Sequence, residues 1–95
     1  MISKAIRNSA RGRDCTLRLP GCHPRNETVV FCHAPGIGMK GMGAKVPDLF
    51  GFWACHKCHA RVDQHLSGWD YQDILRAMCE TQLALYDMGI ITIKS

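Results

Sequence analysis

The sequence of 95 residues contains no apolar run near the ~18 residues that a membrane-spanning helix needs, so we expect no membrane-embedded segment. Its first fourteen residues, MISKAIRNSARGRD, also lack the apolar stretch of a secretion signal, which favours a cytoplasmic protein. Repeats and low-complexity tracts are absent. The chain has 46% apolar and 21% charged residues, the composition of a globular protein. Its length predicts one small domain, residues 1–95.

Cysteine, by contrast, is abundant, with six copies in this short chain. Without an export signal such a content indicates metal binding, and a small exported disulfide protein is the alternative. Cys55 and Cys58 form a CxxC pair whose thiolates can reach one tetrahedral zinc ion. Cys15 and Cys22 supply a second, wider pair, with Pro20 and Gly21 turning the chain back before Cys22. We therefore predict a structural zinc site on these four cysteines.

Three further side chains are competitors for that zinc site: Cys32, His23 and His56. Cys32 lies beside His33 in a predicted strand, so only one of the two can face inward. His23 directly follows Cys22, and adjacent residues seldom bind one metal ion. For each competitor, packing or surface exposure is the favoured interpretation.

Acidic residues are scarce in the first two thirds of the chain. Residues 1–61 hold ten Lys and Arg against Asp14, Glu27 and Asp48, a balance of +7, whereas residues 62–95 hold two basic residues against five acidic ones, a balance of −3. A basic front of this kind suits a surface that faces phosphates, which makes DNA the expected partner. An ordinary solvated surface explains the same charges equally well.

The order of predicted elements indicates an α+β domain. A basic arm or helix spans residues 1–13, a core spans 14–66, and a packing helix lies within 68–89. In the core, β-branched and aromatic residues predict strands at 28–33 and 49–54, which pair with each other. Four glycines and two prolines make residues 34–47 a loop, and a helix runs from Cys55 to about Leu66.

The C-terminal helix is expected at about residues 69–88. Ser67 is its predicted N-cap and Gly89 the residue that follows its end. Apolar residues at three-and-four spacing predict the face that packs on the core, and Cys79 is expected to be buried with them. The predicted face consists of Ile74, Leu75, Met78, Leu85 and Tyr86.

Two histidines frame the core. His33 ends the first predicted strand, Asp48 precedes the second, and His59 follows the CxxC motif inside the helix. This order resembles the ββα-metal fold of HNH (His-Me finger) nucleases, a treble-clef-like zinc-stabilised domain here extended by a C-terminal helix. Asp63 stands four residues after His59, so both side chains project from one helix face, as a shared divalent metal ion requires.

The stretch from Arg11 to Asp63 resembles a narrower group, the small prophage-encoded nucleases of the YbcO-like family. The similarity rests on a cysteine followed by PGC, a strand ending in histidine, and the runs GMGAKVPDLF and ACHKCHARVD. It covers more than half of the chain and implies an HNH-like nuclease of phage origin. The resemblance assigns the general base to His33 and a catalytic metal ligand to His59. It assigns structural zinc to the four cysteines.

The sequence departs from the HNH pattern at two positions. Many HNH enzymes carry an acidic metal ligand just before the catalytic histidine, where this chain has Cys32. The middle asparagine is replaced by Asp48, which either binds metal or ties down the loop. Loss of the acidic ligand implies either a weaker metal site or an inactive enzyme kept as a DNA binder.

The resulting hypothesis is a metal-dependent endonuclease that hydrolyses DNA phosphodiester bonds. His33 would take a proton from water, and Mg²⁺ or Mn²⁺ would bind His59 and Asp63, with Asp48 as a possible helper. Phosphate contacts are expected from Lys45, Lys40 and Arg61. The alternatives are a zinc-binding module that docks on DNA without cutting it, and a recombination accessory factor that binds a protein partner.

Overall fold

The computed structural model describes residues 3–22, 26–35, 47–64 and 66–94. Two strands, β1 (Val30–His33) and β2 (Gly51–Ala54), form an antiparallel pair with His33 opposite Gly51 and Val30 opposite Ala54. A Cβ atom on Gly51 would overlap the ring of Phe31, which lies beside it on the neighbouring strand. The observed register confirms that the two predicted strands pair with each other, although each strand is shorter than predicted.

Each strand begins two residues later than predicted, and in each case a local turn explains the difference. Thr28 belongs to a single 3₁₀ turn, Asn26–Thr28, that precedes β1. Leu49 and Phe50 lie in a turn closed by the Phe50 amide on the carbonyl of Pro47. Most of the predicted glycine-rich loop, residues 36–46, lies outside the described residues.

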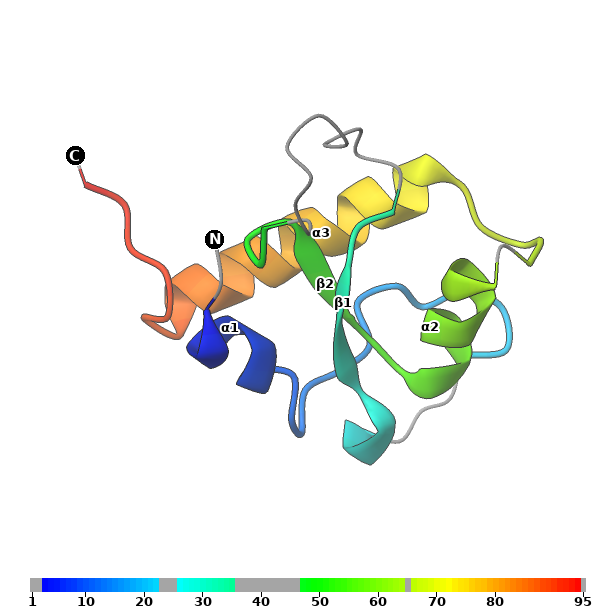
Figure 1. Ribbon diagram of the computed structural model, residues 1–95, viewed down its shortest axis with the longest axis horizontal. Helices are drawn as coiled ribbons and strands as arrows, with labels where there is room; N and C mark the ends of the chain where they lie inside the picture. The colour runs from blue at the N-terminus through cyan, green and yellow to red at the C-terminus, as the bar shows by residue number, and fades with distance from the viewer. Residues whose placement is uncertain (1–2, 23–25, 36–46, 65, 95) are drawn as a thin grey trace.

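In the described part of the chain, three α-helices surround the strand pair (Figure 1). The short α1 (Lys4–Asn8) contacts β1, α2 (His56–Asp63) contacts both strands, and the long α3 (Tyr71–Asp87) packs along β2. The N-terminal segment is thus a helix, one of the two forms predicted for it. None of the helices in the described part of the chain is long and apolar enough to cross a membrane.

The start of α3 differs from the prediction. Its N-cap is Asp70, whose side chain accepts the amide of Asp73, while the Asp73 side chain accepts the amide of Asp70. This reciprocal pair satisfies two otherwise unpaired N–H groups, which the predicted cap at Ser67 does not do. The predicted C-terminal signal is correct, since Gly89 follows the helix with a positive φ of 76°.

The buried face of α3 is also rotated from the predicted one. Its fully or nearly buried residues are Ile74, Ala77, Thr81 and Leu85, at helical spacing. Leu75 and Tyr86, predicted to face the core, are 55% and 50% exposed, and Cys79 is exposed as well. Because Ala77 and Thr81 are small, the helix approaches β2 closely. The Thr81 hydroxyl accepts the amide of Trp53 at 3.2 Å.

The core lies between α3, the strands and the segment before β1. Phe52, Ala54 and Leu17 are completely buried there. Trp53 connects the core to the N-terminal segment, since its indole N–H donates to the Ser9 hydroxyl at 3.0 Å. This packing holds the end of β1 and the start of α2 in fixed relative positions.

Candidate metal centre and histidine site

Four cysteines from distant parts of the chain meet at the start of α2. The sulfur atoms of Cys15, Cys22, Cys55 and Cys58 all lie within 4.8 Å of one another, as the spacing predicted. Cys55 is the N-cap of α2 and Cys58 lies in its first turn. The wider first pair closes because Gly21, at φ 84°, turns the chain and the Cys22 amide donates to the carbonyl of Leu19.

The chemistry of these donors suits a metal ion. Cys15, Cys55 and Cys58 are buried, and Cys22 is partly buried with its sulfur 3.7 Å from that of Cys55. Burial and the neighbouring thiols raise the pKa of Cys22 to about 12, and burial also raises the pKa of Cys58. Without a cation the cluster therefore resists ionisation. A soft divalent ion that accepts four tetrahedral thiolates removes this cost, so the cluster can hold a metal such as zinc.

Two of the three competitors for this cluster are placed elsewhere. Cys32 is buried with its thiol directed to the carbonyl of Val30, and burial raises its pKa to about 12. His56 does not belong to the four-residue group. His23 lies outside the described residues. Of the pair at the end of β1, Cys32 faces inward and His33 faces outward, which the alternation of a strand requires.

A second constellation forms where β1 ends. Nε2 of His33 lies 2.7 Å from Oδ1 of Asp48, a residue that is only 1% exposed. The other oxygen of Asp48, Oδ2, accepts the amide of Ser3 at 2.6 Å and Nε–H of Arg7 at 2.9 Å. Burial opposes ionisation of Asp48, but these three contacts outweigh it and lower its pKa to about 2.

The state of Asp48 determines how the His33 ring is protonated. An ionised carboxylate can only accept hydrogen bonds, so the neutral ring must carry its proton on Nε2. The lone pair then lies on Nδ1, where it can accept a proton. Two roles were left open for Asp48, metal binding and anchoring of the chain. The contacts of Asp48 with Ser3 and Arg7 support the anchoring role. Asp48 orients His33 in addition.

His33 opens onto a small cavity between the end of β1 and α2. The cavity has a volume of about 120 Å³. His59 and Asp63 reach it from α2, one helical turn apart, so three of the predicted catalytic residues share one concave site. Its walls are Cys32, His33, Pro35, Phe52, His59, Val62 and Asp63.

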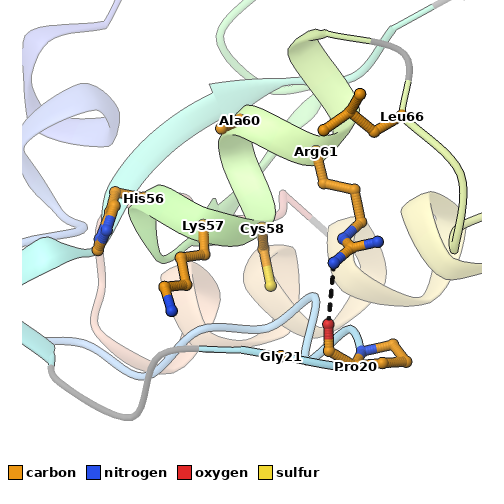
Figure 2. A pocket seen from close by; sticks show the side chains of 8 residues that line it. All are labelled: Pro20, Gly21, His56, Lys57, Cys58, Ala60, Arg61 and Leu66. Carbon is orange, nitrogen blue, oxygen red and sulfur yellow. Dashed lines mark hydrogen bonds between the residues drawn. The ribbon is translucent and has the colours of Figure 1, made fainter.

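Of the three predicted phosphate ligands, the structure describes Arg61. Lys40 and Lys45 lie outside the described residues. The guanidinium of Arg61 donates to the carbonyl of Pro20 at 3.3 Å, drawn in Figure 2, and to that of Ser67 at 2.7 Å. Gly68 makes room for it, since a Cβ there would lie 2.7 Å from Nη1 of Arg61. Arg61 thus holds two turns together, and its contact with phosphate stays a prediction.

A further cavity, of about 340 Å³, separates α2 from the Pro20–Gly21 turn (Figure 2). Lys57 and Arg61 line it, together with Cys58 of the metal cluster. Cations beside a cluster of thiolates reduce the cost of their negative charge. We therefore regard this cavity as the surroundings of the metal centre.

Comparison with known proteins identifies the family. The sequence model of the family described as putative nuclease YbcO matches residues 4–89. Putative nuclease YbcO of Escherichia coli K12 is 36% identical over 91 residues, which cover 90% of this chain and 95% of the relative. The chain belongs to the YbcO family. The relative from Enterobacteria phage 82 shows the same identity and coverage.

A solved structure extends the comparison from the sequence to the fold. A putative bacteriophage protein from Escherichia coli K-12 MG1655 is similar to this chain with a TM-score of 0.70 and 33% identity, over 90% of this chain and 100% of that one. The YbcO match begins at Lys4 and ends at Gly89, so it includes α1, the four cysteines and every residue of the histidine site except Ser3.

Two residues of the histidine site were missed by sequence reasoning. Both Ser3 and Arg7 contact Asp48 from the N-terminal segment. For this segment the sequence predicted only a basic arm or helix. Ser3 is recognisable as an N-cap, since its hydroxyl accepts the Ile6 amide. Its contact with Asp48 spans 45 residues and leaves no local pattern in the sequence.

Proposed function

We propose that this protein is a metal-dependent endonuclease of the HNH type that hydrolyses DNA phosphodiester bonds with His33 as the general base. The observation that supports it most is the cavity in which His33, His59 and Asp63 meet, with Asp48 held behind His33. Membership of a nuclease family with relatives in a bacterium and in a phage supports the same class of reaction.

In the proposed reaction, Nδ1 of His33 takes a proton from the attacking water. The carboxylate of Asp48, 2.7 Å from Nε2, stabilises the imidazolium that forms and keeps the ring in one orientation. His33 is suited to this task because it ends a strand, so its backbone is fixed while 37% of its side chain remains exposed. Water and a phosphate can therefore reach the ring.

His59 and Asp63 would hold a divalent ion such as Mg²⁺ or Mn²⁺ at the opposite wall of the cavity. An imidazole nitrogen and a carboxylate oxygen one helical turn apart are suitable ligands for such an ion. When bound, the ion would stabilise negative charge on the phosphate and on the leaving oxygen. Cys32, which is buried, lines the same cavity and occupies the position where many HNH enzymes have an acid, so His59 and Asp63 would have to supply the metal ligands here.

The four-cysteine cluster would give the site its rigidity. Zinc bound there joins the first turn of α2 to the segment that carries Cys15 and Cys22. Because α2 also carries His59 and Asp63, the metal centre fixes the position of the catalytic wall. The +7 balance of residues 1–61 would draw the phosphate backbone of DNA toward this part of the molecule.

The proposal is tested with purified protein and supercoiled plasmid, linear duplex and single-stranded DNA, each with Mg²⁺, Mn²⁺ or EDTA. We expect nicking or cleavage in the presence of metal and none in EDTA. Zinc content is measured in every sample, because loss of structural zinc would remove activity for a different reason. DNA binding without cleavage in any of these conditions would instead identify a non-catalytic DNA-binding module. The absence of both would favour a recombination accessory factor.

A further inference from the structure

We propose that Arg7 of α1 is a positioning residue that fixes Asp48, and through Asp48 the orientation and tautomer of His33. This inference rests on the proposed function only for its kinetic consequence, because the state of the His33 ring can be measured without any substrate. It assigns a role to the N-terminal helix, which contributes nothing to the walls of the cavity beside His33.

The contacts of Asp48 divide between its two oxygens. Oδ2 accepts Nε–H of Arg7 at 2.9 Å and the backbone N–H of Ser3 at 2.6 Å, so both of its lone-pair directions are used by α1 and its cap. Oδ1 is left for Nε2 of His33 at 2.7 Å. With Oδ2 held at two points, the carboxylate cannot rotate without breaking a charge-assisted hydrogen bond.

Together with the Ser3 amide and the His33 ring, Arg7 also keeps the pKa of Asp48 low and its carboxyl group ionised. The carboxylate is 1% exposed, and burial alone would favour its protonated form. The Arg7 side chain is 42% exposed, so its own positive charge remains hydrated while it compensates the buried negative charge. Without Arg7, the carboxyl group is closer to taking up a proton. A protonated Asp48 could donate to Nε2 of His33, which would move the ring proton to Nδ1 and remove the proposed base.

The geometry favours arginine at this position for a specific reason. The donor that reaches Oδ2 is Nε, which lies within the side chain, while the two terminal nitrogens extend beyond it. A lysine has one donor group at the end of a flexible stem, so it keeps the charge but not the fixed direction of the bond. We therefore expect Arg7→Lys to restore only part of the function.

The test compares Arg7→Met, which keeps an unbranched stem, with Arg7→Lys and with Lys4→Ala. Lys4 is an exposed cation of the same helix and controls for general attraction of DNA. For Arg7→Met we expect kcat to fall by roughly tenfold with KM unchanged, because a misaligned base affects the chemical step. Arg7→Lys should lie between this variant and wild type. Lys4→Ala should keep the wild-type kcat.

The second readout is the ¹⁵N spectrum of the His33 ring in the free, zinc-loaded protein, assigned with His33→Ala. The spectra are recorded at a pH at which the ring is neutral, where wild type should carry its ring proton on Nε2, and Arg7→Met should show a mixture of tautomers or a change to Nδ1. A mixed or Nδ1-protonated ring in wild type would overturn the inference even if Arg7→Met does not fold. So would a folded Arg7→Met with the wild-type spectrum. If wild type cleaves no DNA, the nuclease proposal fails, and the spectrum still decides the role of Arg7.

Discussion

The imidazole of His33 and the carboxylate of Asp48 meet where β1 ends, with Nε2 of the histidine 2.7 Å from Oδ1 of the aspartate. One partner is 1% exposed and the other 37%, so a buried anion supports a histidine that solvent and substrate can reach. Such an arrangement orients a base and stabilises the charge that it gains.

Replacing Asp48 with asparagine tests this pairing. The amide has nearly the same shape but only one accepting oxygen, which cannot serve His33 and the donors of Ser3 and Arg7 together. We expect Asp48→Asn to reduce plasmid cleavage at least roughly tenfold, because the His33 ring then loses its fixed tautomer. Cleavage rates at saturating DNA measure this effect, and a variant as fast as wild type would show that His33 needs no support from Asp48.

The same substitution has a consequence for stability against acid. The pKa of Asp48 in the folded chain, about 2, lies below its ordinary value of 3.8, so its ionised form favours folding. This contribution, on the order of 2 kcal/mol, is complete above pH 4 to 5 and is lost as the pH falls toward 2. The unfolding free energies of wild type and Asp48→Asn, measured with urea, should therefore approach each other as the pH falls from about 4 to about 2. A difference independent of pH would contradict the assigned contacts.

Zinc content and thermal unfolding test the cysteine cluster. We expect one tightly held zinc ion per chain, and Cys55→Ser or Cys58→Ser should give unfolded or insoluble protein, since the site does not exist in the unfolded chain. Cys79→Ser is the matched control, because Cys79 is exposed on α3 and lies outside the cluster. Full thermal stability of a metal-free sample with reduced thiols would rule out a structural metal ion.

Thr81 offers a test of how α3 packs on β2. Its buried hydroxyl accepts the Trp53 amide and lies 3.2 Å from the hydroxyl of Thr16. Thr81→Val keeps the shape but leaves the amide unpaired, which should cost about 1–3 kcal/mol of unfolding free energy. Leu83→Ala on the same helix, where the side chain is 67% exposed, should change stability by less than about 0.5 kcal/mol. Equal effects would mean that the buried face is placed wrongly.

The dependence of DNA binding on salt tests the charge distribution. If residues 1–61 face the phosphates, affinity should fall steeply with salt, because each phosphate that is neutralised releases a counterion. Lys45→Ala should lower the slope by about one unit. Lys94→Ala, which removes an exposed cation from the acidic part of the chain, should not. Binding that does not respond to salt would contradict a phosphate-facing role.

Local patterns in the sequence predicted much of this structure. The CxxC spacing predicted two cysteines of the cluster, and strand alternation predicted that only one of Cys32 and His33 faces inward, which the structure shows to be Cys32. The i+4 spacing of His59 and Asp63 placed both on the wall of one cavity. Each of these signals depends on residues close in sequence, for which backbone geometry leaves few alternatives.

The parts that sequence reasoning missed depend on packing. Which face of α3 is buried depends on the close approach of Ala77 and Thr81 to β2. The apolar residues Leu75 and Tyr86, which are exposed, led the sequence pattern to predict a different face. Similarly, the bonds of Ser3 and Arg7 to Asp48 span more than forty residues and require the complete fold. Short-range periodicity carries no information on such contacts.

Comparing wild type with His33→Ala in plasmid nicking, side by side in Mg²⁺ and in Mn²⁺, tests the proposed base. The substitution removes no zinc ligand, and Lys94→Ala serves as a control, because Lys94 is exposed and belongs neither to the cysteine cluster nor to the walls of the cavity. We predict that His33→Ala cleaves ~10²–10⁴-fold more slowly while its zinc content and DNA affinity match those of wild type. Equal cleavage rates for the two proteins would contradict the role of His33 and with it the proposed mechanism.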